Sequence, residues 1–168
     1  MSPVVVDTNV PIAANRQAHA GPECVIACSD ALARVVTGGM VVIDDQWRIL
    51  GEYGAHLARS GQPGPGDAFY YWVLVNSRNP ERCHWQTITP LADDPDDFEE
   101  FPRDSELASF DRADRKFVAV ARAHPEHPPI LEATDRGFWE ARHALERHGV
   151  TVGFLCLDEV RQCAQIRP

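Results

Sequence analysis

The sequence predicts an α/β fold, a three-layer sandwich built on a central, mostly parallel sheet. Short apolar segments alternate with longer segments of helical periodicity along the 168 residues. Most of the short segments are apolar throughout, as strands buried on both faces of a parallel sheet are. The apolar fraction of 44% suffices for one core of ordinary size, so we predict a single domain over residues 1–168.

Four segments have the composition of buried strands, being short and rich in Val, Ile or Leu. In chain order they are 4–6 (VVV), 40–43 (MVVI), 128–133 (PPILEA) and 150–155 (VTVGFL). The first three stop at polar residues. Because ligands of parallel sheets bind beyond the carboxyl ends of the strands, these polar residues are the first candidates for function.

Six segments have the apolar spacing of helices, with a repeat of three or four residues. Gly38-Gly39 follows the first of them and Pro125 follows the fourth, and both residue types end helices. Asp67 is in a position to cap the third. The predicted helices cover about 22–37, 46–59, 68–77, 110–124, 138–148 and 158–163.

Residues 79–105 are the least regular part of the chain and include the stretch PLADDPDDFEEFPRD. Its prolines and acids are typical of a solvated loop, and the acids lack the order of an EF-hand calcium loop. We therefore predict an irregular acidic excursion from the domain at about 79–105.

The net charge of −9 disfavours general nucleic-acid binding, because contacts to phosphate need Lys and Arg. Fifteen of the 16 basic residues are Arg, and Lys116 is the single Lys. A group of carboxylates that holds a divalent cation is an exception to this inference, since the cation reverses the local charge.

The N-terminal sequence MSPVVVDTNV does not resemble a signal peptide, and no apolar run is long enough to span a membrane. We therefore expect a cytoplasmic protein with no membrane partner. The five cysteines are odd in number and contain no CxxC pair, which favours reduced thiols. Cys24 and Cys28 are four residues apart, the spacing of one helical face rather than of a zinc knuckle.

Four acids are candidates for one site at the carboxyl ends of the strands. Asp7 follows the first strand and Asp135 follows the third, while Asp114 opens a helix and Glu52 lies on the inward stripe of another. Each also has a structural interpretation, as a strand end, a helix cap or a surface ion pair. A buried carboxylate needs a partner or a metal, which makes the group of four more informative than any member.

In order and rough spacing, these acids resemble the PIN domain, the metal-dependent ribonuclease fold of VapC-type toxins. The motifs are VVVDTNV with Asp7, ILGEYGAHL with Glu52, DRKFVAVARA with Asp114 and ILEATDRGF with Asp135. The resemblance implies a PIN-like sandwich that hydrolyses RNA phosphodiester bonds as an endoribonuclease with Mg²⁺ or Mn²⁺. It also implies an RNA substrate, an antitoxin partner if the chain is a toxin, and a homodimer. The segment 79–105 departs from a minimal PIN domain.

The resemblance gives Asp7, Glu52, Asp114 and Asp135 the role of metal ligands in catalysis, with water orientation as an alternative for Glu52. Six other residues are candidates for holding the carboxylates or the substrate by hydrogen bonds or phosphate contacts. They are Thr8, Asn9, Arg112, Arg115, Lys116 and Thr134.

Two other functions remain open. The chain could be a non-catalytic PIN-like module that binds a basic protein. It could also be a phosphatase of the haloacid dehalogenase type, whose first strand likewise ends in Asp. That chemistry needs a second acid two residues later, where this sequence has Asn9. No nucleophile-elbow motif GxSxG supports serine catalysis.

Overall fold

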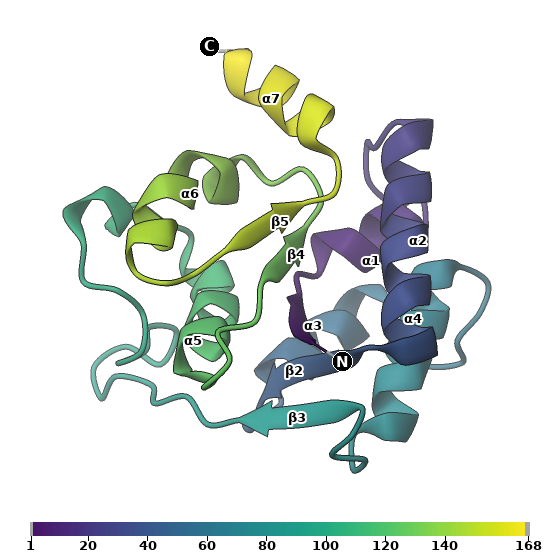
Figure 1. The fold of residues 1–168 in the computed structure, drawn as a ribbon, viewed down its shortest axis with the longest axis horizontal. Coiled ribbons are helices and arrows are strands. Elements are labelled where there is room, and N and C mark those ends of the chain that lie inside the picture. The colour runs from purple at the N-terminus through teal and green to yellow at the C-terminus, as the bar shows by residue number, and fades with distance from the viewer. Residues whose placement is uncertain (1, 167–168) are drawn as a thin grey trace.

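A computed structural model describes residues 2–166 and shows a parallel sheet of five strands in the order β3-β2-β1-β4-β5 (Figure 1). All four strand pairs are parallel. The strands are β1 (Pro3–Val6), β2 (Met40–Asp44), β3 (Cys83–Gln86), β4 (Ile130–Glu132) and β5 (Val152–Phe154). The predicted α/β class with a parallel sheet is confirmed.

Helices cover both faces of this sheet (Figure 1). They are α1 (Asn9–Ala14), α2 (Pro22–Gly38), α3 (Arg48–His56), α4 (Pro65–Asn76), α5 (Arg115–Ala123), α6 (Arg136–Arg147) and α7 (Leu157–Gln165). Helices α1, α2 and α4 pack against one another on one side, and α5 packs against β1, β2 and β4 on the other. The core lies between these layers and is closed by fully buried side chains such as Val5, Ile43, Phe69 and Phe117.

Two elements were not predicted. Helix α1 has six residues, too few to show a helical repeat in the sequence. Strand β3 lies in the expected excursion, and its sequence CHWQ has neither the uniform apolar character nor the β-branched residues of a buried strand. A smaller difference concerns Asp67, which lies in the first turn of α4 rather than before it. Its carboxylate accepts from the Gly64 N–H at 2.9 Å.

The order in which strands are added to the sheet changes sides next to β1. Strands β1, β2 and β3 are added in one direction, and β4 then returns to the other side of β1. Such a reversal separates the two connections that leave the neighbouring strands, and so opens a crevice at their carboxyl ends. In this fold the crevice lies between the ends of β1 and β4.

The acidic excursion is attached to the domain through its own buried residues. Phe98 and Phe101 belong to the core, and the Asp97 carboxylate accepts from Arg115 at 2.8 Å and from Arg103 at 2.7 Å. The prediction of a solvated loop is therefore correct for only part of this segment, such as the exposed Asp96.

The expectation of reduced cysteines is wrong for one pair, because Cys24 and Cys156 form a disulfide. They are 132 residues apart, so no sequence spacing indicates this pairing. The bond joins the first turn of α2 to the N-cap of α7. In residues 2–166 no helix combines the length and the apolar character needed to cross a membrane.

Candidate functional site

Asp7 and Glu132 face each other at the crevice between β1 and β4. The register pairs Val5 with Ile130 and Val6 with Leu131, so the next position on each strand is Asp7 or Glu132. Paired positions on neighbouring strands direct their side chains to the same face of the sheet. Both carboxyl groups are almost fully buried, with Asp7 1% and Glu132 0% exposed. The topology therefore forces two acids together at the place where parallel sheets bind ligands.

Each of the two carboxylates has one oxygen held by backbone N–H groups and one oxygen free. Asp7 Oδ1 accepts from the Asn9 N–H at 2.8 Å. Glu132 Oε1 accepts from the Ala133 N–H at 2.8 Å and from the Asp135 N–H at 3.1 Å. Asp7 Oδ2 and Glu132 Oε2 are buried without a hydrogen-bond partner when both groups are ionised. Backbone anchoring of one oxygen orients the other, as outer hydrogen bonds do for metal ligands.

The pKa values of these two groups reflect the cost of ionising both. Burial, followed by the Glu132 charge, holds the pKa of Asp7 well above its usual range. Burial raises the pKa of Glu132 to about 7, although hydrogen bonds to its carboxylate oppose the shift. With one proton between them, Asp7 donates to Glu132 and both free oxygens acquire a partner. A cation placed between them would satisfy the same two oxygens.

Asp114 adds a third acid from the start of α5. It is the N-cap of that helix, yet its side chain makes no capping hydrogen bond. Asp111 accepts from the Ala113 N–H at 2.9 Å and caps the preceding 3-10 turn, so the local capping role falls to Asp111. Burial, then the charges of Asp7 and Asp135, raise the pKa of Asp114 to about 8. The Asp114 carboxyl group is thus not used to cap its helix, and it lies close enough to Asp7 and Asp135 for their charges to raise its pKa.

Asp135 and Glu52 complete what we call the acid cluster. Asp135 caps α6 through the Phe138 N–H at 2.9 Å, and its charge raises the pKa values of Asp114 and Glu132. Glu52 forms an ion pair with Lys116 and contributes to the raised pKa of Asp7. The members of the acid cluster are Asp7, Glu52, Asp114, Glu132 and Asp135.

Glu132 is the member that the sequence did not predict as a site residue. It lies inside the motif ILEATDRGF, in a strand whose neighbours are apolar. The usable signal was an acid within a buried strand, since such a group needs a partner. Its alignment with Asp7 requires knowing that β4 pairs with β1, which the sequence does not show.

The polar neighbours predicted for the substrate have different environments. Thr8 is buried and its Oγ1 has no hydrogen-bond partner, whereas Asn9 and Thr134 are partly exposed. Arg115 is buried in its ion pair with Asp97 and lies over the Phe101 ring, 4.6 Å from the centroid. Its guanidinium is therefore used inside the fold and is not presented at the crevice.

Lys116 is also buried, and its ammonium group lies among the acids. It pairs with Glu52, donates to the Ala113 carbonyl and partly offsets the raised pKa of Asp114. A cationic side chain thus already neutralises one edge of the acid cluster.

A cleft of about 300 Å³ adjoins this edge and is lined by several basic side chains. Arg112 and Lys116 line it, as the sequence predicts for phosphate contacts, and Arg48 lies on the same cleft. Arg48 and Arg112 also form ion pairs with Asp96 and Asp94 of the excursion. The cleft is therefore a surface next to the acid cluster that has basic groups in place for an anionic ligand.

The acid cluster has the carboxylate oxygens that a Mg²⁺ or Mn²⁺ site needs, but these oxygens are not yet gathered around one point. Hard divalent cations take carboxylate oxygens, and two buried oxygens here have no partner. Within residues 2–166, however, the single group of three ligand atoms that lie within 4.8 Å of one another comes from cysteines. Binding of one cation by three of the acids therefore requires at least one carboxylate side chain to move inward.

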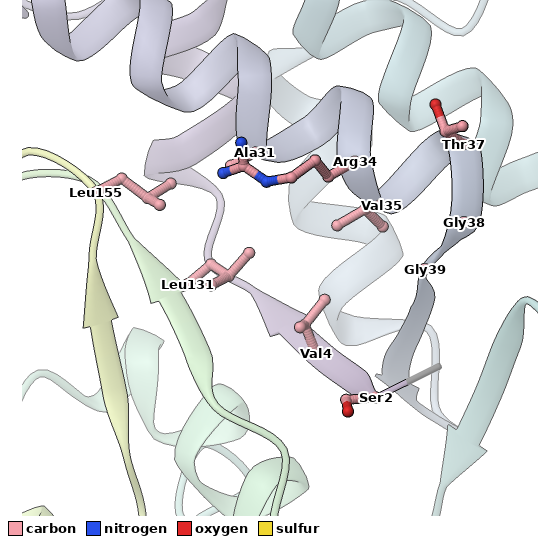
Figure 2. Close-up of a pocket in the computed structure, with 10 residues that line it drawn as sticks. All are labelled: Ser2, Val4, Ala31, Arg34, Val35, Thr37, Gly38, Gly39, Leu131 and Leu155. Atoms are coloured by element: carbon pink, nitrogen blue, oxygen red, sulfur yellow. The ribbon is translucent and has the colours of Figure 1, made fainter.

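A larger cleft, of about 510 Å³, lies away from the acid cluster between α2 and strands β1 and β4. Figure 2 shows its lining, in which Val4 and Leu131 form the floor and Val35 and Arg34 project from α2. None of its lining residues is acidic, so it offers no carboxylate ligand for a hard cation.

Comparisons with known proteins leave the interpretation to the geometry. No protein-family model matches the chain, and no curated protein or solved structure was found to be similar to it.

Proposed function

We propose that this protein is a PIN-like, metal-dependent endoribonuclease that hydrolyses RNA phosphodiester bonds at the acid cluster. The observation that supports this most is the Asp7–Glu132 pair, two buried carboxyl groups in register whose free oxygens lack a partner when both are ionised. Burying two facing carboxyl groups lowers the stability of a fold, because a shared proton or a cation must neutralise them. Such pairs therefore occur mainly where a functional site uses them.

Asp7, Glu132 and Asp114 are the residues that would hold Mg²⁺ or Mn²⁺. When bound, the cation supplies an electrophile that polarises the phosphodiester and neutralises the charge that develops on it. Asp135 keeps the loop after β4 in position through its cap of α6, and Glu52 is available to orient a water once Lys116 releases it. The adjoining cleft, with Arg48, Arg112 and Lys116, would hold the RNA backbone.

The test is cleavage of a labelled pool of single-stranded and hairpin RNA with Mn²⁺ or Mg²⁺. We expect cleavage by the wild type, no cleavage with EDTA, and a loss of at least about 100-fold for Asp7→Asn. Asp45→Asn is the matched control, since Asp45 follows β2 as Asp7 follows β1 but is exposed. Full activity in a folded Asp7→Asn protein would exclude the proposal. Turnover of p-nitrophenyl phosphate without RNA cleavage would favour the phosphatase alternative.

A second function, a non-catalytic module that binds a basic protein, is favoured by one contact. Lys116 already supplies a positive charge to Glu52, and a partner could extend this neutralisation with its own Lys or Arg. An antitoxin that supplies Lys or Arg would be such a partner. If Mn²⁺ does not bind by calorimetry while a basic protein partner does, this second function replaces the first.

A further inference from the structure

Three cysteine sulfurs meet where α2 contacts the start of α7. Cys24 and Cys28 lie one helical turn apart on α2, and Cys156 is the N-cap of α7. Their three Sγ atoms all lie within 4.8 Å of one another, and all three residues are buried. Cys24 and Cys156 form the disulfide, and Cys28 Sγ lies 3.7 Å from Cys156 Sγ. The fold therefore gathers one more sulfur than a disulfide requires.

The spacing of these sulfurs is that of a thiolate metal site. Two sulfurs bound to one tetrahedral zinc ion at about 2.3 Å lie about 3.8 Å from each other. The distance from Cys28 to Cys156 already has this value. A disulfide bond holds its two sulfurs about 2 Å apart. After reduction, Cys24 and Cys156 would therefore have to separate by about 1.8 Å to reach the zinc spacing.

The surroundings of the sulfurs suit a cation. A cleft of about 270 Å³ leads to Cys24 and Cys156 and is lined by the acids Glu23, Asp158 and Glu159. Glu159 also joins the two elements, because its carboxylate accepts from the Gly21 N–H at 3.1 Å. The cleft provides an entry path, and its acids provide negative charge near the sulfurs.

We propose that the reduced protein binds one Zn²⁺ ion through Cys24, Cys28 and Cys156, and that the disulfide is the metal-free, oxidised form of the same site. A dithiol reductant transfers two electrons and two protons to the Cys24–Cys156 bond, giving two thiols and a new disulfide in the reductant. Zn²⁺ then replaces the three thiol protons, which are released to solvent. Formation of the Cys24–Cys156 bond and binding of the ion exclude each other, since both use the same two sulfurs.

The Cys28 thiol is buried in the core and is not activated as a nucleophile. Burial, then the charges of Glu132 and Glu159, raise the pKa of its thiol to about 12. A neutral thiol is a poor nucleophile, so Cys28 is not suited to attack the neighbouring disulfide. A thiol that binds a metal ion, in contrast, releases its proton to solvent, because the metal stabilises the thiolate.

The test is titration of the protein with Co²⁺ and then Zn²⁺, before and after treatment with dithiothreitol and its removal by gel filtration. We expect the reduced wild type to bind one Co²⁺ per chain with a near-ultraviolet sulfur-to-cobalt band, which stoichiometric Zn²⁺ removes. The oxidised protein should show no such band. Cys28→Ser should weaken Co²⁺ binding at least about tenfold, and Cys163→Ser, at an exposed free thiol, should not.

Two results would overturn this site. One is a reduced, folded wild type without the sulfur-to-cobalt band, and the other is a Cys28→Ser protein that binds Co²⁺ as tightly as the wild type. If Cys28→Ser does not fold, the intensity of the wild-type band decides, because it scales with the number of cobalt–sulfur bonds. Co²⁺ bound only at the acid cluster gives no sulfur band and also counts against the proposal. Asp7→Asn should leave the band unchanged, so this test is independent of ribonuclease activity.

Discussion

Asp7 and Glu132 illustrate how much a single residue depends on its position in the sheet. Asp7 ends a central strand and could have been an ordinary turn residue. Burial in its position opposite Glu132, followed by the Glu132 charge, instead raises the pKa of its carboxyl group well above the usual range. The Asn side chain reproduces the shape and the donor of a protonated Asp, which makes Asp7→Asn informative about stability as well as activity.

We predict that Asp7→Asn raises the melting temperature of the metal-free protein at pH 8 by about 3 °C or more. The amide donates to Glu132 without having to take up a proton. The gain should therefore be smaller at pH 5 than at pH 8, because the pKa of Asp7 is raised and a falling pH favours its protonated form. Calorimetry of Asp7→Asn and Asp45→Asn at both pH values measures this. A melting temperature that falls at pH 8 would mean that Asp7 does not face a carboxylate.

Lys116 gives a second prediction at this scale. Lys116→Met removes the ammonium group that competes with a cation, so Mn²⁺ should bind about tenfold more tightly. Lys116→Arg keeps the charge and should bind Mn²⁺ like the wild type. Isothermal titration calorimetry measures both. Equal affinities in the two variants would place the cation away from Glu52 and Lys116.

The sequence alone pointed to four of the five acids of the acid cluster, but not to how they lie relative to one another. Asp7 and Asp135 were predictable because an acid that follows an apolar strand can be recognised from the local sequence alone. Asp114 was predictable as a helix start, but only the structure shows that Asp111 takes the capping role. Glu132 and the inward direction of Lys116 depend on strand pairing and on the packing of α5, which local patterns do not encode.

Among the elements, the acidic excursion and α5 depend on each other. The Asp97 carboxylate is buried, and burial opposes its ionisation. Hydrogen bonds from Arg103, the Phe98 N–H and Arg115 outweigh this effect and lower the pKa of Asp97. The excursion is thus held to the start of α5, close to the acid cluster and the cation-lined cleft.

We predict that Arg115→Met destabilises the protein by about 3–5 kcal/mol, because it leaves the Asp97 carboxylate buried with one partner fewer. The exposed Arg112 supplies the control, and Arg112→Met should cost less than about 1 kcal/mol. Urea unfolding gives both values. Hydrogen exchange should increase mainly in residues 89–103 of Arg115→Met, and uniform exchange across the chain would contradict this anchoring role.

The elements that escaped prediction were those whose stability comes from their neighbours. Strand β3 forms because four backbone positions pair with β2, although its own residues are half exposed. Helix α1 is short, and its packing against α2 and α4 determines it. The long elements with their own apolar repeat, such as α2 and α5, were predictable because their pattern alone specifies the buried face.

At the scale of the whole molecule, the raised pKa values of the buried acids couple folding to protons. In the folded protein Glu132 and Asp114 have pKa values of about 7 and about 8, and that of Asp7 is also raised. The folded state then binds more protons than the unfolded state above about pH 4. The stabilisation that these three acids contribute is therefore complete below that pH and is lost as the pH rises through 7 and 8.

We predict that the metal-free protein loses a few kcal/mol of unfolding free energy between pH 5 and pH 9. Saturating Mn²⁺ should flatten this profile, because the cation replaces the protons on the same carboxylates. Chemical denaturation at a series of pH values, with EDTA or with Mn²⁺, measures both curves. Stability that rises steadily with pH in EDTA would show that the acids are ionised without penalty and do not form a cluster.

The disulfide between Cys24 and Cys156 also determines how the oxidised chain would respond to tension. A pull applied at both ends passes through the bond and bypasses the residues between them, so it acts only on the segments before Cys24 and after Cys156. Strand β1 belongs to the first of these segments although it lies in the middle of the sheet. An enzyme that unfolds the oxidised protein by pulling from its N-terminal side would have to remove this central strand from the sheet first. This step would separate Asp7 from Glu132 while residues 24–156 remain linked in one loop by the disulfide.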